Sequence, residues 1–366
     1  MAVGIFSAIV MLVTSAALAS AEEFGDRQFS ALARECRSQS SQPPSPAALR
    51  IRDAALAQHK IFHGHRIDDT GRIVFFGHSE VESDHEGDDS FTADKVPWRR
   101  VLRYWEAVTG EPAATAAHRT LGAWYYRGAL DNPPPAELAR GGVSLRRLLE
   151  VIDRLDFSEF GDRAGAYKAA IQQSVIRASL SDVAWSAAFV SFIMRDAGLD
   201  EKIFAYGAAH VAYVSAAVAQ SVRDGNGGER THFFRACDPA LTPPRVGDLL
   251  CYHRHTDGTR NPYLPRGPSL FRSLFEDFAN GERPIIRSHC DIVAGVDARA
   301  RKVTVIGGNV QNSVTQRVLT LDKRGVLAKR QGTKACGPNN PDSLATGRAN
   351  CNFNDQKWFV LLQAVM

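Results

Sequence analysis

Apolar residues recur at helical spacing through the first half of the chain. This periodicity predicts helices over residues 47–59, 97–107 and 144–155, and residues 164–178 lead directly to the apolar stretch that follows. A short run of β-branched and aromatic residues at 72–76 predicts one strand between the first two helices. The first half is therefore expected to be mainly helical.

The stretch 181–198 has the most continuous apolar pattern, and we expect it to form one buried helix. Ser179 or Ser181 is a candidate N-cap, and Gly198 suits a left-handed C-terminal cap. Asp182 and Ser186 would then lie one turn apart on one face. Apolar side chains cover most of the remaining circumference: Trp185, Phe189, Val190, Ile193, Met194 and Ala197.

After this helix the pattern changes to short apolar runs bounded by Gly, Asp or Asn. These runs predict strands over 247–252, 289–294, 302–306 and 358–362, and hence an antiparallel sheet of at least four strands. The long excursion 253–288 contains apolar residues at helical spacing over 269–278. We interpret it as a helical insertion that forms either a lid at the strand ends or a satellite packed on the core.

The N-terminal region is expected to be a targeting segment. Residues 1–21 resemble a cleavable signal peptide that ends near Ala21, although no Lys or Arg precedes the apolar run. An uncleaved anchor is the alternative. The proline-rich segment 22–46 is interpreted as a linker, and 47–366 as one domain with a mainly helical part, 47–178, and a helix-plus-sheet part, 179–366. The expected location is periplasmic or secreted, with no stable membrane insertion after cleavage.

The net charge and the cysteine content limit which binding partners and which cellular compartment are expected. A net charge of +4, from 44 basic and 40 acidic residues, does not indicate nucleic-acid binding. The 6 cysteines of a chain expected to be exported predict one or more disulfides. Cys336 and Cys351 flank a loop that a disulfide would stabilise by roughly 3 kcal/mol; two free buried thiols are the alternative.

No cofactor or metal site is expected. His59, His63 and His65 lie close together, but no carboxylate follows at a fixed spacing, so a solvated helix end is preferred. The acidic turn 83–89 lacks the residue order of an EF-hand loop.

Three residues follow the order of a nucleophilic hydrolase. Ser186 begins the apolar helix, His289 opens a strand, and Asn309 follows the next strand. A helix N-terminus stabilises developing negative charge, a histidine accepts the proton of the nucleophile, and a third polar group fixes the histidine tautomer.

Four sequence blocks, 185–190, 246–251, 289–293 and 306–309, resemble the DUF2272 family of bacterial proteins over roughly residues 48–365. They are more distantly similar to the CHAP and NlpC/P60 cell-wall amidases and endopeptidases. That resemblance implies an α+β, papain-like fold and hydrolysis of peptidoglycan peptides. It also implies that Ser186 stands where those amidases carry cysteine.

A serine hydroxyl must lose its proton during attack, so the site would need a stronger base than a cysteine site. Asp291 shares the side of the strand that carries His289 and could supply that base strength. Trp185, Asp182 and His210 are candidate substrate-binding residues, with helix capping as the alternative for His210. Cys290 faces the other side, and a disulfide with Cys251 is expected if their strands pair.

Each candidate has a structural alternative. Ser186 can be a small residue at a helix–sheet contact, His289 a hydrogen-bonded core histidine, and Asn309 a turn residue. The first hypothesis is therefore a Ser/His hydrolase of amide or ester bonds in envelope polymers. The second is a degenerate papain-like module that binds a cell-wall peptide or glycan, and the third a toxin-like or structural envelope protein.

Overall fold

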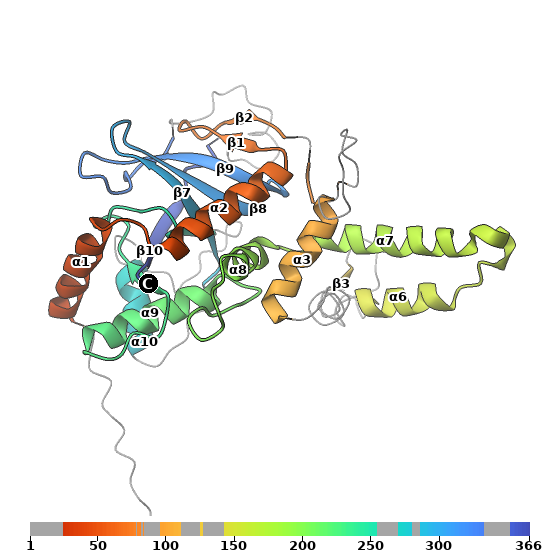
Figure 1. Ribbon diagram of the computed structural model, residues 1–366, viewed down its shortest axis with the longest axis horizontal. Helices are drawn as coiled ribbons and strands as arrows, with labels where there is room; N and C mark the ends of the chain where they lie inside the picture. The colour runs from red at the N-terminus through yellow and green to blue at the C-terminus, as the bar shows by residue number, and fades with distance from the viewer. Residues whose placement is uncertain are drawn as a thin grey trace, which may run out of the picture.

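An eight-stranded sheet organises the protein. The computed structural model describes residues 25–77, 79–81, 83, 96–110, 125–126, 143–254, 270–279, 286–332 and 352–366. Within these residues the strand order of the large sheet is β2-β1-β9-β8-β7-β6-β10-β5 (Figure 1). Neighbouring strands run antiparallel except β1 and β9, which are parallel. The fold is thus mixed α/β with a mostly antiparallel sheet.

The four predicted strands are confirmed, and the sheet extends beyond them. β6 (Leu249–His253), β7 (Ser288–Asp297), β8 (Lys302–Val310) and β10 (Lys357–Ala364) correspond to the four apolar runs. The predicted strand near residue 73 is β2 (Ile73–Phe75). The sheet also contains β1 (His65–Ile67), β5 (Phe234–Cys237) and β9 (Ser313–Thr320), while β3 (Tyr125–Tyr126) and β4 (Val143–Ser144) pair separately.

The predicted helices of the first half are also confirmed. They are α2 (Pro46–Ile61), α3 (Pro97–Thr109) and α6 (Leu145–Arg154), and they are followed by a further helix, α7 (Ala164–Asp182). A short 3₁₀ segment, η3 (Ser158–Arg163), joins α6 to α7, and the two helices form a hairpin that extends away from the sheet (Figure 1). In the second half α9 (Val211–Gly225) packs on β5, and α10 (Leu270–Ala279) contacts α9 and β10.

The expected single helix over 181–198 is wrong. The chain breaks between α7, which ends at Asp182, and α8, which runs from Ser186 to Asp196. Val183 has extended backbone angles, φ −103° and ψ 128°, so α7 stops there and Trp185 becomes the N-cap residue of α8. Gly198 does adopt the left-handed conformation, with φ 82°, as its position predicted.

Helix α8 occupies the centre of the fold. It packs against β7 and β8 and also contacts α2 and α3 (Figure 1). Its buried residues include Phe189, Val190, Ile193 and Met194. An all-round apolar helix of this kind is expected at a position enclosed by other elements. The break before Ser186 therefore places the N-terminus of this packed helix beside the start of α9 and the residue that follows β6.

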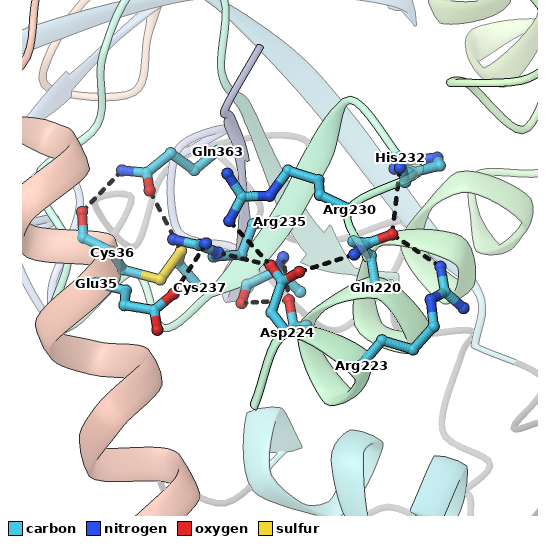
Figure 2. Close-up of polar contacts among 12 residues, drawn as sticks. Glu35, Cys36, Gln220, Arg223, Asp224, Arg230, His232, Arg235, Cys237 and Gln363 are labelled. Carbon is cyan, nitrogen blue, oxygen red and sulfur yellow. Dashed lines mark hydrogen bonds and ion pairs between the residues drawn. A yellow bond between two sulfur atoms is a disulfide. The ribbon is translucent and has the colours of Figure 1, made fainter. Parts of the chain in front are cut away.

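Residues 22–46 do not form a simple linker. Most of them fold as α1 (Asp26–Ser40), and Cys36 of α1 forms a disulfide with Cys237 of β5. Figure 2 shows this bond beside buried Arg235, which makes ion pairs with Asp224 and with Glu35 of α1. A disulfide and an ion pair thus attach α1 to the sheet edge, which the proline-rich sequence did not predict.

The second disulfide joins Cys251 of β6 to Cys290 of β7, as expected from their strand positions. The structure does not describe Cys336, Cys351 or the signal-like segment 1–21.

Among the helices described, none is by itself both long and apolar enough to cross a membrane. One pair bent by 99°, Ser158–Ser181 with Ser186–Asp196, meets those criteria only when joined.

Candidate active site

Ser186 lies at the first position of α8 and makes a direct contact with a histidine. Its Oγ is 2.7 Å from Nε2 of His210. Both residues are buried, with 3% and 4% of their surfaces exposed. The first N–H groups of a helix have no partner within it, so they give this end a positive potential. The serine hydroxyl is therefore placed between a helix N-terminus and an imidazole.

His210 is in turn held by Tyr213. His210 is the N-cap residue of α9, and the hydroxyl of Tyr213, less than one turn later, contacts its Nδ1. Burial lowers the pKa of His210 well below its ordinary value, and His289 and Arg254 lower it further. Burial also raises the pKa of Tyr213 well above its usual range. At neutral pH the histidine is thus neutral and the tyrosine protonated.

The second histidine, His289, belongs to a buried ion-pair network on the sheet. Its Nε2 is 2.8 Å from Oδ1 of Asp291, two residues along β7. Oδ2 of Asp291 lies 3.1 Å from Nε of Arg317, a residue of β9. The two groups form an ion pair, but their relative orientation does not meet the criteria for a hydrogen bond. Burial alone would raise the pKa of Asp291, but Arg317 and His289 outweigh burial and hold this pKa below its ordinary value.

Arg254 connects the two histidine systems. It follows the last residue of β6, and its Nη2 lies 2.8 Å from Nδ1 of His289 and 3.4 Å from Oγ of Ser186. Burial lowers the pKa of His289 to about 4, although Asp291 acts in the opposite direction. His289 is therefore neutral at pH 7, and a neutral imidazole can accept a hydrogen bond from the guanidinium.

Two glycines of β8 allow the close packing around this network. A Cβ on Gly307 would lie 1.9 Å from Oδ1 of Asp291 and 2.9 Å from Nε2 of His289. A Cβ on Gly308 would lie 2.4 Å from Cγ of Phe189 in α8. The Gly-Gly pair therefore lets β8 approach both the His289–Asp291 pair and the nucleophile-bearing helix.

The structure brings together four of the residues proposed from sequence: Ser186, His210, His289 and Asp291. Ser186 is hydrogen-bonded to His210, whereas His289 reaches it only through Arg254. Asp291, rather than Asn309, occupies the orienting position at His289 Nε2. The expected direct contact between Ser186 and His289 is therefore replaced by a contact with His210.

Three other proposed residues have different positions. Asn309 lies in an irregular part of β8 with φ 55°, and no hydrogen bond between it and His289 is found within the described chain. Trp185 is fully buried and packs on Phe62 and Tyr104, so it is a core residue. Asp182 ends α7 instead of sharing a helix with Ser186, and its side chain lies outside the described set.

Sequence reasoning missed Arg254, Tyr213 and Arg317. Tyr213 follows His210 by three residues, a spacing that places both residues on one helix face. This spacing could have predicted that their side chains lie close together. Arg317 is on a strand that was not predicted, and Arg254 is the second residue of the segment 253–288 that was interpreted as an insertion. Neither has a local pattern that points to the site.

The arrangement suits acyl transfer chemistry. It places a hydroxyl nucleophile, a neutral imidazole, a helix N-terminus and a guanidinium within a few ångströms of one another, which are the groups that such a reaction uses. Over the described ranges, no group of three or more His, Cys, Asp or Glu residues is arranged to hold a metal ion.

Comparison with known proteins gives a family. The DUF2272 family, described as an uncharacterized protein conserved in bacteria, matches residues 156–364, which include every residue of the site described above. No curated protein and no solved structure matches the chain. The family match covers more than half of the 366 residues, so the chain belongs to the DUF2272 family.

Proposed function

We propose that the protein is a hydrolase of amide or ester bonds that uses Ser186 as its nucleophile. The observation that carries this proposal is the 2.7 Å contact between Ser186 Oγ and His210 Nε2 at the N-terminus of α8. A nucleophile within hydrogen-bond reach of a base is the geometric requirement for this chemistry.

In the proposed reaction His210 Nε2 takes the hydroxyl proton while Oγ bonds to the carbonyl carbon of the substrate. The resulting tetrahedral intermediate expels an amine or alcohol, which leaves with the proton from His210, and an acyl-serine ester remains. Water then attacks the ester, again losing its proton to His210. Release of the carboxylic acid returns Ser186 to its hydroxyl form.

Tyr213 and Arg254 support these steps. His210 can act as a base only in the tautomer with hydrogen on Nδ1, and the hydroxyl of Tyr213 is positioned to accept that hydrogen bond. The negative charge that develops on the carbonyl oxygen would be stabilised by the first N–H groups of α8 and by the guanidinium of Arg254.

His289 and Asp291 have a positioning role in this proposal. The lone pair of His289 Nδ1 faces Arg254, and its Nε2 faces Asp291, so both ring nitrogens are occupied. The alternative, in which His289 is the base, requires Arg254 to leave Nδ1 when substrate binds. The two assignments differ in which histidine is indispensable.

We propose that the substrates are peptides of the bacterial cell envelope, above all those of peptidoglycan. We also propose that α8 and the sheet form a papain-like core. Support comes from the four sequence blocks similar to the CHAP and NlpC/P60 enzymes. The two disulfides within the described residues are consistent with an oxidising compartment, the periplasm or the exterior.

The test measures hydrolysis of peptidoglycan and of small esters by the purified protein, together with labelling by a serine-directed fluorophosphonate. We expect Ser186→Ala and His210→Gln to lower kcat by about 100-fold or more. His289→Gln should lower it less and leave labelling of Ser186 detectable. Ser221→Ala is the matched control, since this buried serine of α9 contacts Ala236 of β5 instead of the site.

The opposite ranking, with His289→Gln inactive and His210→Gln active, would transfer the base role to His289. Equal activity of Ser186→Ala and the unsubstituted protein would reject Ser186 as the nucleophile and with it the proposed mechanism.

A second candidate function is peptide or glycan binding without cleavage. It is favoured by the burial of Ser186 and by the contact of Arg254 with the His289 lone pair. Binding of soluble peptidoglycan fragments with neither turnover nor fluorophosphonate labelling would support it.

A further inference from the structure

Arg254 has a charge that its described surroundings do not neutralise. Within the described residues its guanidinium contacts Ser186 Oγ and His289 Nδ1, both uncharged groups at neutral pH. No described carboxylate lies within ion-pair distance of its guanidinium. Arg254 is only partly exposed, so water screens its charge less than at the surface, and an anionic partner would be attracted to it.

The rest of the site leaves this charge unbalanced. Asp291, the acidic side chain that the described network of His289 contains, is already paired with Arg317. His210 and His289 are neutral, and the N-terminus of α8 adds positive potential instead of removing it. The described site therefore has an excess of positive charge beside the nucleophile.

The guanidinium has donors to spare for a ligand. Within the described structure only its Nη2 takes part in a hydrogen bond, and the planar fork of an arginine matches both oxygens of a carboxylate. Because His289 and Asp291 fix the Nη2 end, the remaining N–H groups have a defined direction. This is the condition for specific, rather than diffuse, recognition of an anion.

We propose that Arg254 is a specificity-determining residue that binds a carboxylate in the acyl part of the substrate. The inference rests on the proposed function, because it places that carboxylate relative to the bond that Ser186 attacks. The acyl part stays bonded to Ser186 Oγ after the leaving group departs. A cation 3.4 Å from Oγ can therefore hold the same carboxylate through both halves of the reaction.

The substrate class that follows is an acidic acyl compound, such as a peptide cleaved after a residue that bears a free carboxylate. A neutral acyl group of the same shape would leave Arg254 without a counter-charge. It should therefore react more slowly even though the bond to be cleaved is identical.

The kinetic test compares two anilides of the same shape, the 4-nitroanilides of N-acetylglutamate (through its α-carboxyl) and of N-acetylglutamine. With the unsubstituted protein we expect kcat/KM to be about 10- to 100-fold higher for the glutamyl anilide. This ratio should fall towards one in Arg254→Gln and be partly retained in Arg254→Lys. Arg287→Gln is the matched control, because Arg287 is exposed and contacts Arg254 only through its carbonyl oxygen.

A ratio near one with the unsubstituted protein would overturn the proposal, and so would a ratio unchanged in Arg254→Gln. Equal losses on both anilides in Arg254→Gln would assign Arg254 to the developing oxyanion alone. The ratio separates these outcomes because a residue that serves only the oxyanion, or only the fold, affects both substrates alike.

A binding measurement tests the same site without turnover. Ser186→Ala is titrated by calorimetry with N-acetylglutamate α-amide and with N-acetylglutamine amide. We expect binding of the carboxylated compound only, weakening with added salt and lost when Arg254→Gln is combined with Ser186→Ala. Selective binding of the carboxylated compound, without hydrolysis of any substrate by the unsubstituted protein, would reject the proposed function but support the carboxylate site. Absence of selectivity would reject the carboxylate site whether or not hydrolysis occurs.

Discussion

His289 Nδ1 faces Nη2 of Arg254 at 2.8 Å. A guanidinium only donates, so this nitrogen carries the lone pair, and the hydrogen on Nε2 points to Asp291. The network thus assigns one tautomer and one protonation state to His289. Protonation of Nδ1 would place its N–H against the N–H donor of Arg254. The geometry of the site therefore depends on pH.

The first prediction concerns the pH dependence of stability through His289. The unfolded chain takes up a proton at the ordinary pKa near 6.5, but the folded state takes it up only near pH 4. Between these values the unfolded state binds more protons, so the stability contributed by His289 rises with pH and is lost on acidification. His210 acts in the same direction.

The measurement is urea unfolding of the unsubstituted protein and of His289→Gln between pH 4 and 7. The difference in unfolding free energy should grow as the pH rises from about 4 to 6.5. A constant difference across that range would contradict the assignment of a neutral, buried His289.

The second prediction concerns Asp248, which should have the opposite pH dependence. Its carboxyl oxygens accept hydrogen bonds from the backbone N–H groups of Arg245 and Ala364, but burial raises its pKa from 3.8 to about 7. The folded state therefore retains the proton between these values while the unfolded state releases it. Stability contributed by Asp248 falls as the pH rises through this window.

Asp248→Asn removes this titration and replaces one acceptor by a donor, so it should cost about 1–3 kcal/mol near pH 4. The loss relative to the unsubstituted protein should shrink towards pH 7. A loss that instead increases with pH would show that Asp248 is ionised in the folded protein.

The third prediction concerns the close approach of β8 to the site. A methyl group at Gly307 would overlap Asp291 Oδ1, so Gly307→Ala should displace the carboxylate from His289. We expect a loss of about 1–3 kcal/mol in stability and a marked loss of proposed activity. Gly295→Ala is the control, because its methyl group would meet only Thr304 Cβ at 3.9 Å. Equal behaviour of the two variants in unfolding and activity assays would contradict the packing described.

The fourth prediction concerns the attachment of α1. The Cys36–Cys237 disulfide links positions 201 residues apart in sequence. Replacing both cysteines by alanine should lower the free energy of unfolding by about 2–5 kcal/mol, mainly because the unfolded chain gains freedom. Hydrogen exchange should increase first in α1. Protection of α1 that is unchanged in the double variant would show that the Arg235–Glu35 ion pair and packing suffice to hold it.

The sequence by itself determined the local elements. Apolar periodicity placed α2, α3, α6 and α10, and strand patterns placed β6, β7, β8 and β10, because these segments bury one face or both. It also placed Cys251 opposite Cys290, since pairing β6 with β7 makes them neighbours. For the site it supplied Ser186, His210, His289 and Asp291 as candidates.

Only the tertiary structure decided how those candidates are connected. Whether His210 or His289 reaches Ser186 depends on how α9 and the sheet pack around α8, a relationship with no local signal. The break between Asp182 and Ser186 lies where α8 meets the sheet and helices α2 and α3, so the apolar periodicity of the segment did not reveal it. Arg254, which follows β6, and Arg317, on β9, join the site from distant parts of the chain, because pairing across the sheet and not spacing along the chain specifies this network.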